Sequence, residues 1–181
     1  MGRRFETRAA LQDAALELFA DLGYEGTTTA RIARRAGVSE MTLFRHFASK
    51  ESLLLDDPFD PVMADAVLSR PADEPPMRAL AEGIRAAWLG LDTEQVAELR
   101  VRLRIAAGAT TLSGALERNS VETVTALTAA LVARGVSAEG SGIAASAVIA
   151  GLSRALMDWA QGEEGGIQDA VYRALDVLGG R

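Results

Sequence analysis

The sequence predicts an all-α protein of about nine helices, with a three-helix domain followed by a larger helical bundle. Apolar residues recur at intervals of three and four, which is the period of a helix, and Ala and Leu dominate them. β-Branched residues are scattered and do not alternate with polar ones, so no segment is typical of a strand. Gly and Pro mark several of the points where the helical patterns stop, and the connections between the expected helices are as short as those of helical bundles.

The first helix is expected over Glu6–Leu22, with Gly23 as its end. Its apolar stripe comprises Leu11, Ala15, Leu18, Phe19 and Leu22.

A second, short helix begins near Thr28 or Thr29 and ends at Gly37, and a third begins at Ser39 and ends near Phe47. The hydroxyl residues at both starts can accept hydrogen bonds from the first free backbone amides.

Lys50 opens a fourth helix, which we expect Pro58 and Pro61 to interrupt before it can continue towards Arg70. After a proline-rich break, Pro76 is well placed as a first helical residue. The remaining helices are expected over Met77–Leu91, Glu94–Ala107, Leu112–Arg134, Ala138–Trp159 and Ile167–Leu178.

Composition excludes several classes of site. The chain has no Cys and one His, which excludes disulfides, thiolate zinc sites and multi-His metal sites, and we expect neither a metal nor a cofactor. The N-terminus lacks the apolar core of a signal peptide, and the longest uncharged run, Gly140–Ser153, is too short to span a bilayer. We therefore expect a cytoplasmic protein without a membrane partner.

The net charge of −6 is unevenly distributed. The first 50 residues hold eight basic and six acidic groups, and the remaining 131 hold eleven basic and nineteen acidic groups. This distribution favours a protein that meets phosphates at one end only, although chance variation would also explain it.

Residues Thr28–Phe47 have the spacing of a helix-turn-helix. Ala33 is small where two such helices come closest, and Gly37 stands where the turn needs a positive φ. The buried inner faces are assigned to Ile32, Ala36, Val38, Leu43 and Phe47. A helical hairpin that only packs would share these apolar positions, but it would gain nothing from the arginines beside them.

The segment Leu16–Leu54 resembles the N-terminal domain of the TetR family of bacterial regulators. The matching elements are Leu18-Phe19, Gly23-Tyr24, Gly26-Thr27-Thr28, Ile32-Ala33, Ala36-Gly37-Val38-Ser39, Thr42-Leu43, Phe47 and Lys50-Glu51-Ser52-Leu53. The resemblance implies a DNA-binding domain over residues 1–49, with its motif at 28–47, and an effector-binding and dimerisation domain over residues 50–181. It also implies a ligand-responsive repressor that binds a near-palindromic double-stranded operator as a homodimer. A ligand-dependent activator, a small enzyme and an interaction bundle are the alternatives, and no catalytic constellation supports the enzyme.

The resemblance assigns the third helix to the major groove of DNA. Base edges would be met by Glu40, Met41 and Thr42. The DNA backbone would be met by Thr28, Thr29, Ser39, Phe44, Arg45, His46 and Lys50.

Three of these residues have a second interpretation. Phe44 stands where the family commonly has Tyr, so a phenolic donor is lost. Glu40 is either a reader of cytosine or a solvated residue of the first helical turn. His46 fits a phosphate contact better than a general base, because no nucleophile or acid partner is visible. The Gly140–Ala145 match to G-x-G-x-x-A follows no strand, so we interpret it as a helix start.

The bundle contains a candidate effector pocket for a small apolar or acyl-type ligand with a polar tip. Its candidate residues are Met77, Ile84, Trp88, Leu103, Arg104, Thr110, Asn119 and Thr123. Thr123 could equally be a core residue that is satisfied by its own helix, and Arg104 a merely exposed side chain. Residues Glu94–Arg118 resemble the corresponding part of regulators thought to sense acyl-CoA-like molecules.

The last two helices fit the dimer interface that the resemblance implies. The candidate interface residues are Ala147, Gly151, Ala155, Val171 and Leu178. A monomeric core could bury the same residues. Two recognition helices must stand about 34–36 Å apart on DNA, which favours the dimer.

Overall fold

The computed structural model describes residues 2–56, 59–162 and 165–180. Within these ranges the chain forms ten α-helices and one short 3₁₀ helix, and it forms no strand. The chain divides into two compact units: a head unit, Met1–Asp56 with Leu99–Leu116, and a body unit, Asp57–Glu98 with Glu117–Arg181. The all-α prediction is confirmed.

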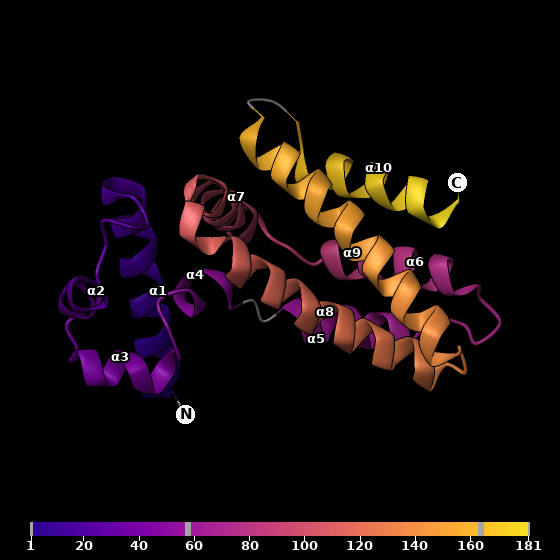
Figure 1. Cartoon of the computed structure of the whole chain (residues 1–181), viewed down its shortest axis with the longest axis horizontal. Coiled ribbons are helices and arrows are strands. Elements are labelled where there is room, and N and C mark those ends of the chain that lie inside the picture. The colour runs from indigo at the N-terminus through magenta and orange to yellow at the C-terminus, as the bar shows by residue number, and fades with distance from the viewer. Residues whose placement is uncertain (1, 57–58, 163–164, 181) are drawn as a thin grey trace. The chain divides into compact units, whose positions relative to one another are not determined.

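The head unit contains α1 (Gly2–Leu22), α2 (Thr29–Arg35), α3 (Glu40–His46) and α4 (Ser52–Leu55), drawn in indigo to purple in Figure 1. Helices α1 and α3 both pack on α2, and α1 also packs on α4. Its core consists of side chains with almost no exposed surface, among them Phe19, Ile32, Leu43, Phe47 and Leu53.

The sequence explains where α2 and α3 begin and turn. The Thr28 hydroxyl accepts a hydrogen bond from the backbone amide of Arg31, and the Ser39 hydroxyl accepts one from the backbone amide of Thr42. Gly37, between the two helices, has φ +71°, a conformation that costs a side-chain-bearing residue energy. The expected caps and turn are therefore confirmed, and Ala33 is buried between the helices as expected.

Two helices pass from one unit to the other along the chain. Helix α7 (Thr93–Gly108) begins in the body unit and ends in the head unit. The 3₁₀ helix η1 (Thr110–Leu112) follows it in the head unit. Helix α8 (Ser113–Ala133) then returns to the body unit.

The body unit also contains α5 (Phe59–Leu68), α6 (Pro76–Trp88), α9 (Ala138–Gln161) and α10 (Ile167–Gly179). Helix α6 packs on α5, α9 and α10, and α9 and α10 lie side by side (Figure 1). Helices α5 and α6 approach closely at Gly83, where a Cβ atom would lie 2.8 Å from the Val67 backbone. Only glycine permits this crossing without a shift of the backbone.

Some boundaries and exposures differ from those expected. Helix α1 begins at Gly2 instead of Glu6, and Leu22, expected on its buried stripe, is 46 % exposed. Pro61 lies in the first turn of α5 and does not interrupt it, because amides there have no helical partner to lose. Pro58 lies outside the described residues. Pro76 is a first helical residue, as predicted.

Helix α9 alone among the helices of the described ranges is long and apolar enough to cross a membrane by length and composition, and only 33 % of its most apolar window is buried. The core helix of a soluble protein passes the same test. One face of α9 packs on α6 and α10. The rest of its apolar surface is exposed in the single chain.

Candidate nucleic-acid interface

Helix α3 buries one side chain and presents the others outward. Leu43 is fully buried and anchors the helix on the core, whereas Met41 and Phe44 are 70 % and 50 % exposed. Glu40 and Arg45 are also exposed, and Thr42 is half-buried. Met41 and Phe44 are three residues apart, so they lie on one outward face of this short helix.

The hydroxyl residues assigned to the DNA backbone have partners in the head unit. Thr28 and Ser39 cap their helices, and the Ser39 hydroxyl also lies 2.9 Å from that of Thr42. Thr29 donates its only hydroxyl proton to Glu40 Oε1 at 2.5 Å. A hydroxyl has one proton, so Thr29 cannot donate to a phosphate while it holds Glu40.

Lys50 lies differently from the phosphate contact expected of it. Its ammonium donates to the backbone carbonyl of Tyr24 at 2.5 Å and lies 4.1 Å from the centre of the Tyr24 ring. Burial lowers the pKa of the Lys50 amine, and the carboxylates of Glu25 and Glu51 oppose this shift. The same surroundings raise the pKa of Tyr24, first through burial and then through Glu51 and Glu25. In this arrangement Lys50 holds the turn that follows α1.

His46 is half-buried at the end of α3, and its backbone is held by a residue that the sequence did not single out. Arg8 of α1 donates to the His46 carbonyl at 2.6 Å and to the Asp56 carboxylate at 2.9 Å. Its guanidinium also lies 4.1 Å from the centre of the Phe47 ring. Arg8 therefore ties the end of α3 to α1. Arg8 is one of several charged residues of α1, so the sequence alone does not identify its role.

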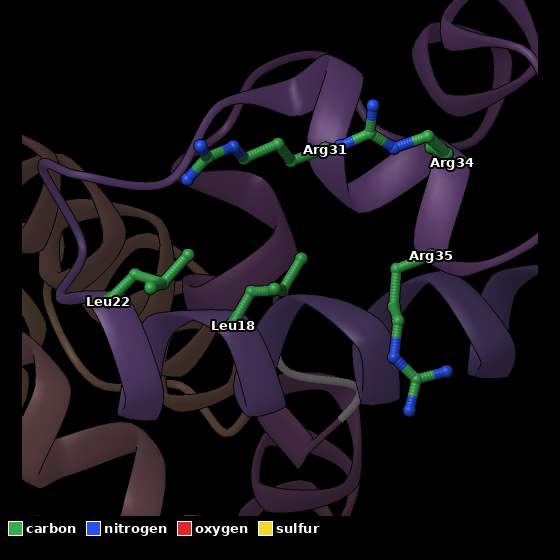
Figure 2. Close-up of a pocket in the computed structure, with 5 residues that line it drawn as sticks. All are labelled: Leu18, Leu22, Arg31, Arg34 and Arg35. Carbon is green, nitrogen blue, oxygen red and sulfur yellow. The ribbon is translucent and has the colours of Figure 1, made fainter.

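A basic surface lies between α1 and α2, the first helix of the motif. Arg31, Arg34 and Arg35 project from α2 around a surface hollow whose other lining residues are Leu18 and Leu22 of α1 (Figure 2). Arg35 pairs with Glu17 of α1 at 2.6 Å. The three arginines are exposed, as expected of residues outside the apolar stripes.

Residues of α7 and η1 are bound to the turn after α1 and to α4 within the head unit. The Thr111 hydroxyl donates to Glu25 Oε1 at 3.1 Å, and Arg102 of α7 donates to the Leu54 carbonyl at the end of α4 at 3.0 Å. A hydrogen bond from its own backbone lowers the pKa of the Glu25 carboxyl, burial opposes this shift, and hydrogen bonds from Thr111 and the charge of Lys50 lower the pKa further. The head unit thus includes residues 99–116 together with the N-terminal helices.

The candidate effector residues fall in both units. Ile84 and Trp88 of α6 are buried in the body unit, and Met77 is half-buried. Thr123 is buried and donates its hydroxyl to the Asn119 carbonyl at 3.2 Å, which matches its interpretation as a core residue. In the head unit the half-buried Leu103 is accompanied by two exposed residues, Arg104 and Thr110.

Some of the candidate dimer residues make contacts within the chain. Val171 is fully buried within its own chain, so its side chain is not available to a second copy. Gly151 faces Leu178 of the same chain, because a Cβ on Gly151 would lie 2.8 Å from Leu178 Cδ1. These residues form the α9–α10 contact inside the body unit. Ala147 is exposed and Ala155 half-buried, and both remain accessible.

Comparison with known proteins identifies the motif. Residues 11–56 match the family of bacterial regulatory proteins described as the tetR family. The chain is 44 % identical over 82 residues to the HTH-type transcriptional regulator TcmR of Streptomyces glaucescens. The aligned segment covers 44 % of this chain and 36 % of that protein. It is 38 % identical over 82 residues to the tetracycline repressor protein class C of Escherichia coli, over 42 % of this chain and 35 % of that protein. The chain thus spans about a third of the length of these curated relatives.

The whole fold also has solved counterparts. A TetR-family transcriptional regulator from Mesorhizobium loti aligns over 99 % of this chain and 96 % of its own, with a TM-score of 0.58 and 21 % identity. At this identity the likeness establishes the fold alone. The family consists of regulatory proteins and not of enzymes. Residues 11–56 thus carry a helix-turn-helix domain of the tetR family, and the whole chain has the all-helical fold of a solved TetR-family regulator.

Proposed function

We propose that the protein is a ligand-responsive repressor in the cytoplasm that binds a near-palindromic DNA operator as a homodimer. The observation that carries the proposal is the outward face of α3, where Met41, Phe44 and Arg45 are exposed on a buried three-helix core. The major groove admits a helix of this kind and displays a distinct pattern for each base pair. The exposed arginines of α2 add the positive charge that phosphates attract.

The exposed apolar surface of α9 supports the homodimer. Ile143 is 66 % exposed, and Ala147 is exposed one turn further along the same helix. Small and apolar side chains at these positions let a second α9 approach closely and remove both surfaces from water. A dimer also supplies the two recognition helices that a two-fold operator needs.

The effector is proposed to be a small apolar or acyl-type molecule bound in the body unit. Met77, Ile84 and Trp88 supply an apolar face on α6, and Asn119 supplies a polar side chain on α8. A ligand releases DNA only if it binds the DNA-incompetent state more tightly than the competent one. We therefore expect its binding to favour a non-binding spacing of the two heads.

The experiment selects duplexes from a randomised library with the purified full-length chain and measures the stoichiometry of the complex by sedimentation. We expect an enriched near-palindromic sequence that binds two chains. Ile143→Glu should give a folded chain that sediments as a monomer and binds the selected duplex at least tenfold more weakly. Val121→Glu, at an apolar position of α8 that is 59 % exposed, adds the same charge away from the proposed contact and serves as the control. Enrichment of no sequence would overturn the DNA-binding proposal, and binding of one chain to a single half-site would overturn the dimer.

A further inference from the structure

The carboxylate of Glu40 is held in position by a residue from another helix. Glu40 is the first residue of α3 and is exposed, and Thr29 is the first residue of α2 and is half-buried. The Thr29 hydroxyl donates to Glu40 Oε1 at 2.5 Å, across eleven residues of sequence. Because Thr28 and Ser39 cap the two helices, the backbone at both ends of this contact is also fixed.

This contact leaves most of the hydrogen-bonding capacity of Glu40 unused. An ionised carboxylate has about four acceptor positions, and Thr29 occupies one of them. A side chain that is held before its partner arrives loses less conformational entropy on binding. The Thr29 contact therefore prepares Glu40 to accept a further hydrogen bond on the outward side of α3.

The bases differ in what they offer a carboxylate in the major groove. Guanine and thymine present acceptors, which repel it. Adenine presents an amine donor beside the N7 acceptor, so that attraction and repulsion oppose each other. Cytosine presents the N4 amine as its only polar group, and it is the base whose edge suits a carboxylate.

Resting on the proposed operator binding, we propose that Glu40 selects cytosine at one position of each half-site by accepting a hydrogen bond from its N4 amine. Thr29 is the positioning residue that keeps Glu40 in the reading geometry. An acidic group on a DNA-binding face is repelled by the phosphates of every sequence, and only a hydrogen bond to the right base offsets this cost, so the group adds discrimination more than affinity. The role assigned to Thr29 replaces the backbone contact expected from the sequence.

The test compares variants in the duplex selection. Glu40→Gln should change the preference at one position from cytosine to adenine, because an amide can bond adenine N6 and N7 together. Thr29→Val keeps the shape but removes the hydroxyl, and should reduce the cytosine preference about fivefold while binding to a non-selected duplex stays within twofold. Thr29→Ser restores the hydroxyl and should restore the preference. Glu17→Gln, which removes the same charge outside the recognition surface, should leave base preference unchanged.

A modified duplex gives an independent measurement. Replacing the selected cytosine by 2-pyrimidinone, which lacks the exocyclic amine, should weaken wild-type binding about fivefold and leave Glu40→Gln binding unaffected. If the wild type selects a sequence but Glu40→Gln keeps the same preference at every position, this assignment is wrong and operator binding stands. If the wild type selects no sequence, the proposed function itself fails.

Discussion

At the scale of single residues, the direction of a cationic side chain decides whether it can meet DNA. Arg45 is exposed in the last turn of α3, whereas the Lys50 ammonium is directed to the Tyr24 carbonyl and ring. The resemblance to the family placed both residues at phosphates. The structure separates them by their partners.

We expect Arg45→Ala to flatten the dependence of log binding constant on log salt concentration by about 0.9, the effect of one lost phosphate contact. Lys50→Met should leave this slope unchanged and lower the melting temperature, because the Tyr24 contacts are lost. Titration of operator at several salt concentrations, together with calorimetry, measures both effects. Arg45→Lys is the control that keeps the charge. A slope flattened by about one unit in Lys50→Met would show that Lys50 turns to phosphate when DNA is bound.

At the scale of helices, two contacts in the body unit depend on glycine. Gly83 permits the α5–α6 crossing, and Gly151 accommodates Leu178 between α9 and α10. Helix α9 also contains Gly142, beside which a Cβ would meet nothing within 4 Å. Gly142 and Gly151 therefore form a matched pair.

Gly151→Leu should destabilise the chain by about 1–3 kcal/mol, the usual cost of overpacking a filled contact. Gly142→Leu should be neutral or stabilising by up to about 1 kcal/mol, because a helix former replaces glycine in open space. Urea denaturation gives both values. Since the Gly151 contact lies within one chain, its loss should not vary with protein concentration, and Leu178→Ala should recover part of it. A loss that disappears at high concentration would place Gly151 at the dimer contact instead.

At the scale of the whole molecule, the chain passes between the two units at three places: after Asp56, after Glu98 and after Leu116. Helices α7 and α8 run without interruption through the second and third of these places. The chain after Asp56 is one covalent route between the units. These two continuous helices are further covalent routes from the body unit to the head unit, and Arg102 and Thr111 bind the α7–α8 region to α4 and α1–α2 residues.

We therefore expect a ligand in the body unit to contact Trp88 and to affect the head unit through helices α7 and α8. We expect Trp88→Ala to raise about tenfold the effector concentration that is needed to release the operator. Without effector, the affinity of this variant for the operator should be unchanged. A fatty acyl-CoA series of increasing chain length is the probe, and operator release is followed by anisotropy. Trp159, which donates to the Gly165 carbonyl at 3.1 Å, is the matched aromatic position, and Trp159→Phe should respond as the wild type does. An unchanged response in Trp88→Ala to a ligand that releases the wild type would place the effector site elsewhere.

The sequence by itself determined the features that depend on near neighbours along the chain. Helices begin at Thr28, Ser39 and Pro76 because hydroxyl caps and a first-turn proline act within one helical turn, and they are predictable for that reason. The positive φ of Gly37 and the dense motif around it likewise depend on local chemistry. These features were enough to identify the helix-turn-helix and the family.

Only the tertiary structure decided the features that join residues distant in sequence. It turned Lys50 towards Tyr24, joined Thr29 to Glu40, buried Val171 in its own chain, and grouped residues 99–116 with the head unit. A periodic pattern shows that a side chain is apolar or charged, but not which surface or partner meets it. That choice depends on the packing of helices separated by tens of residues, which no local preference specifies.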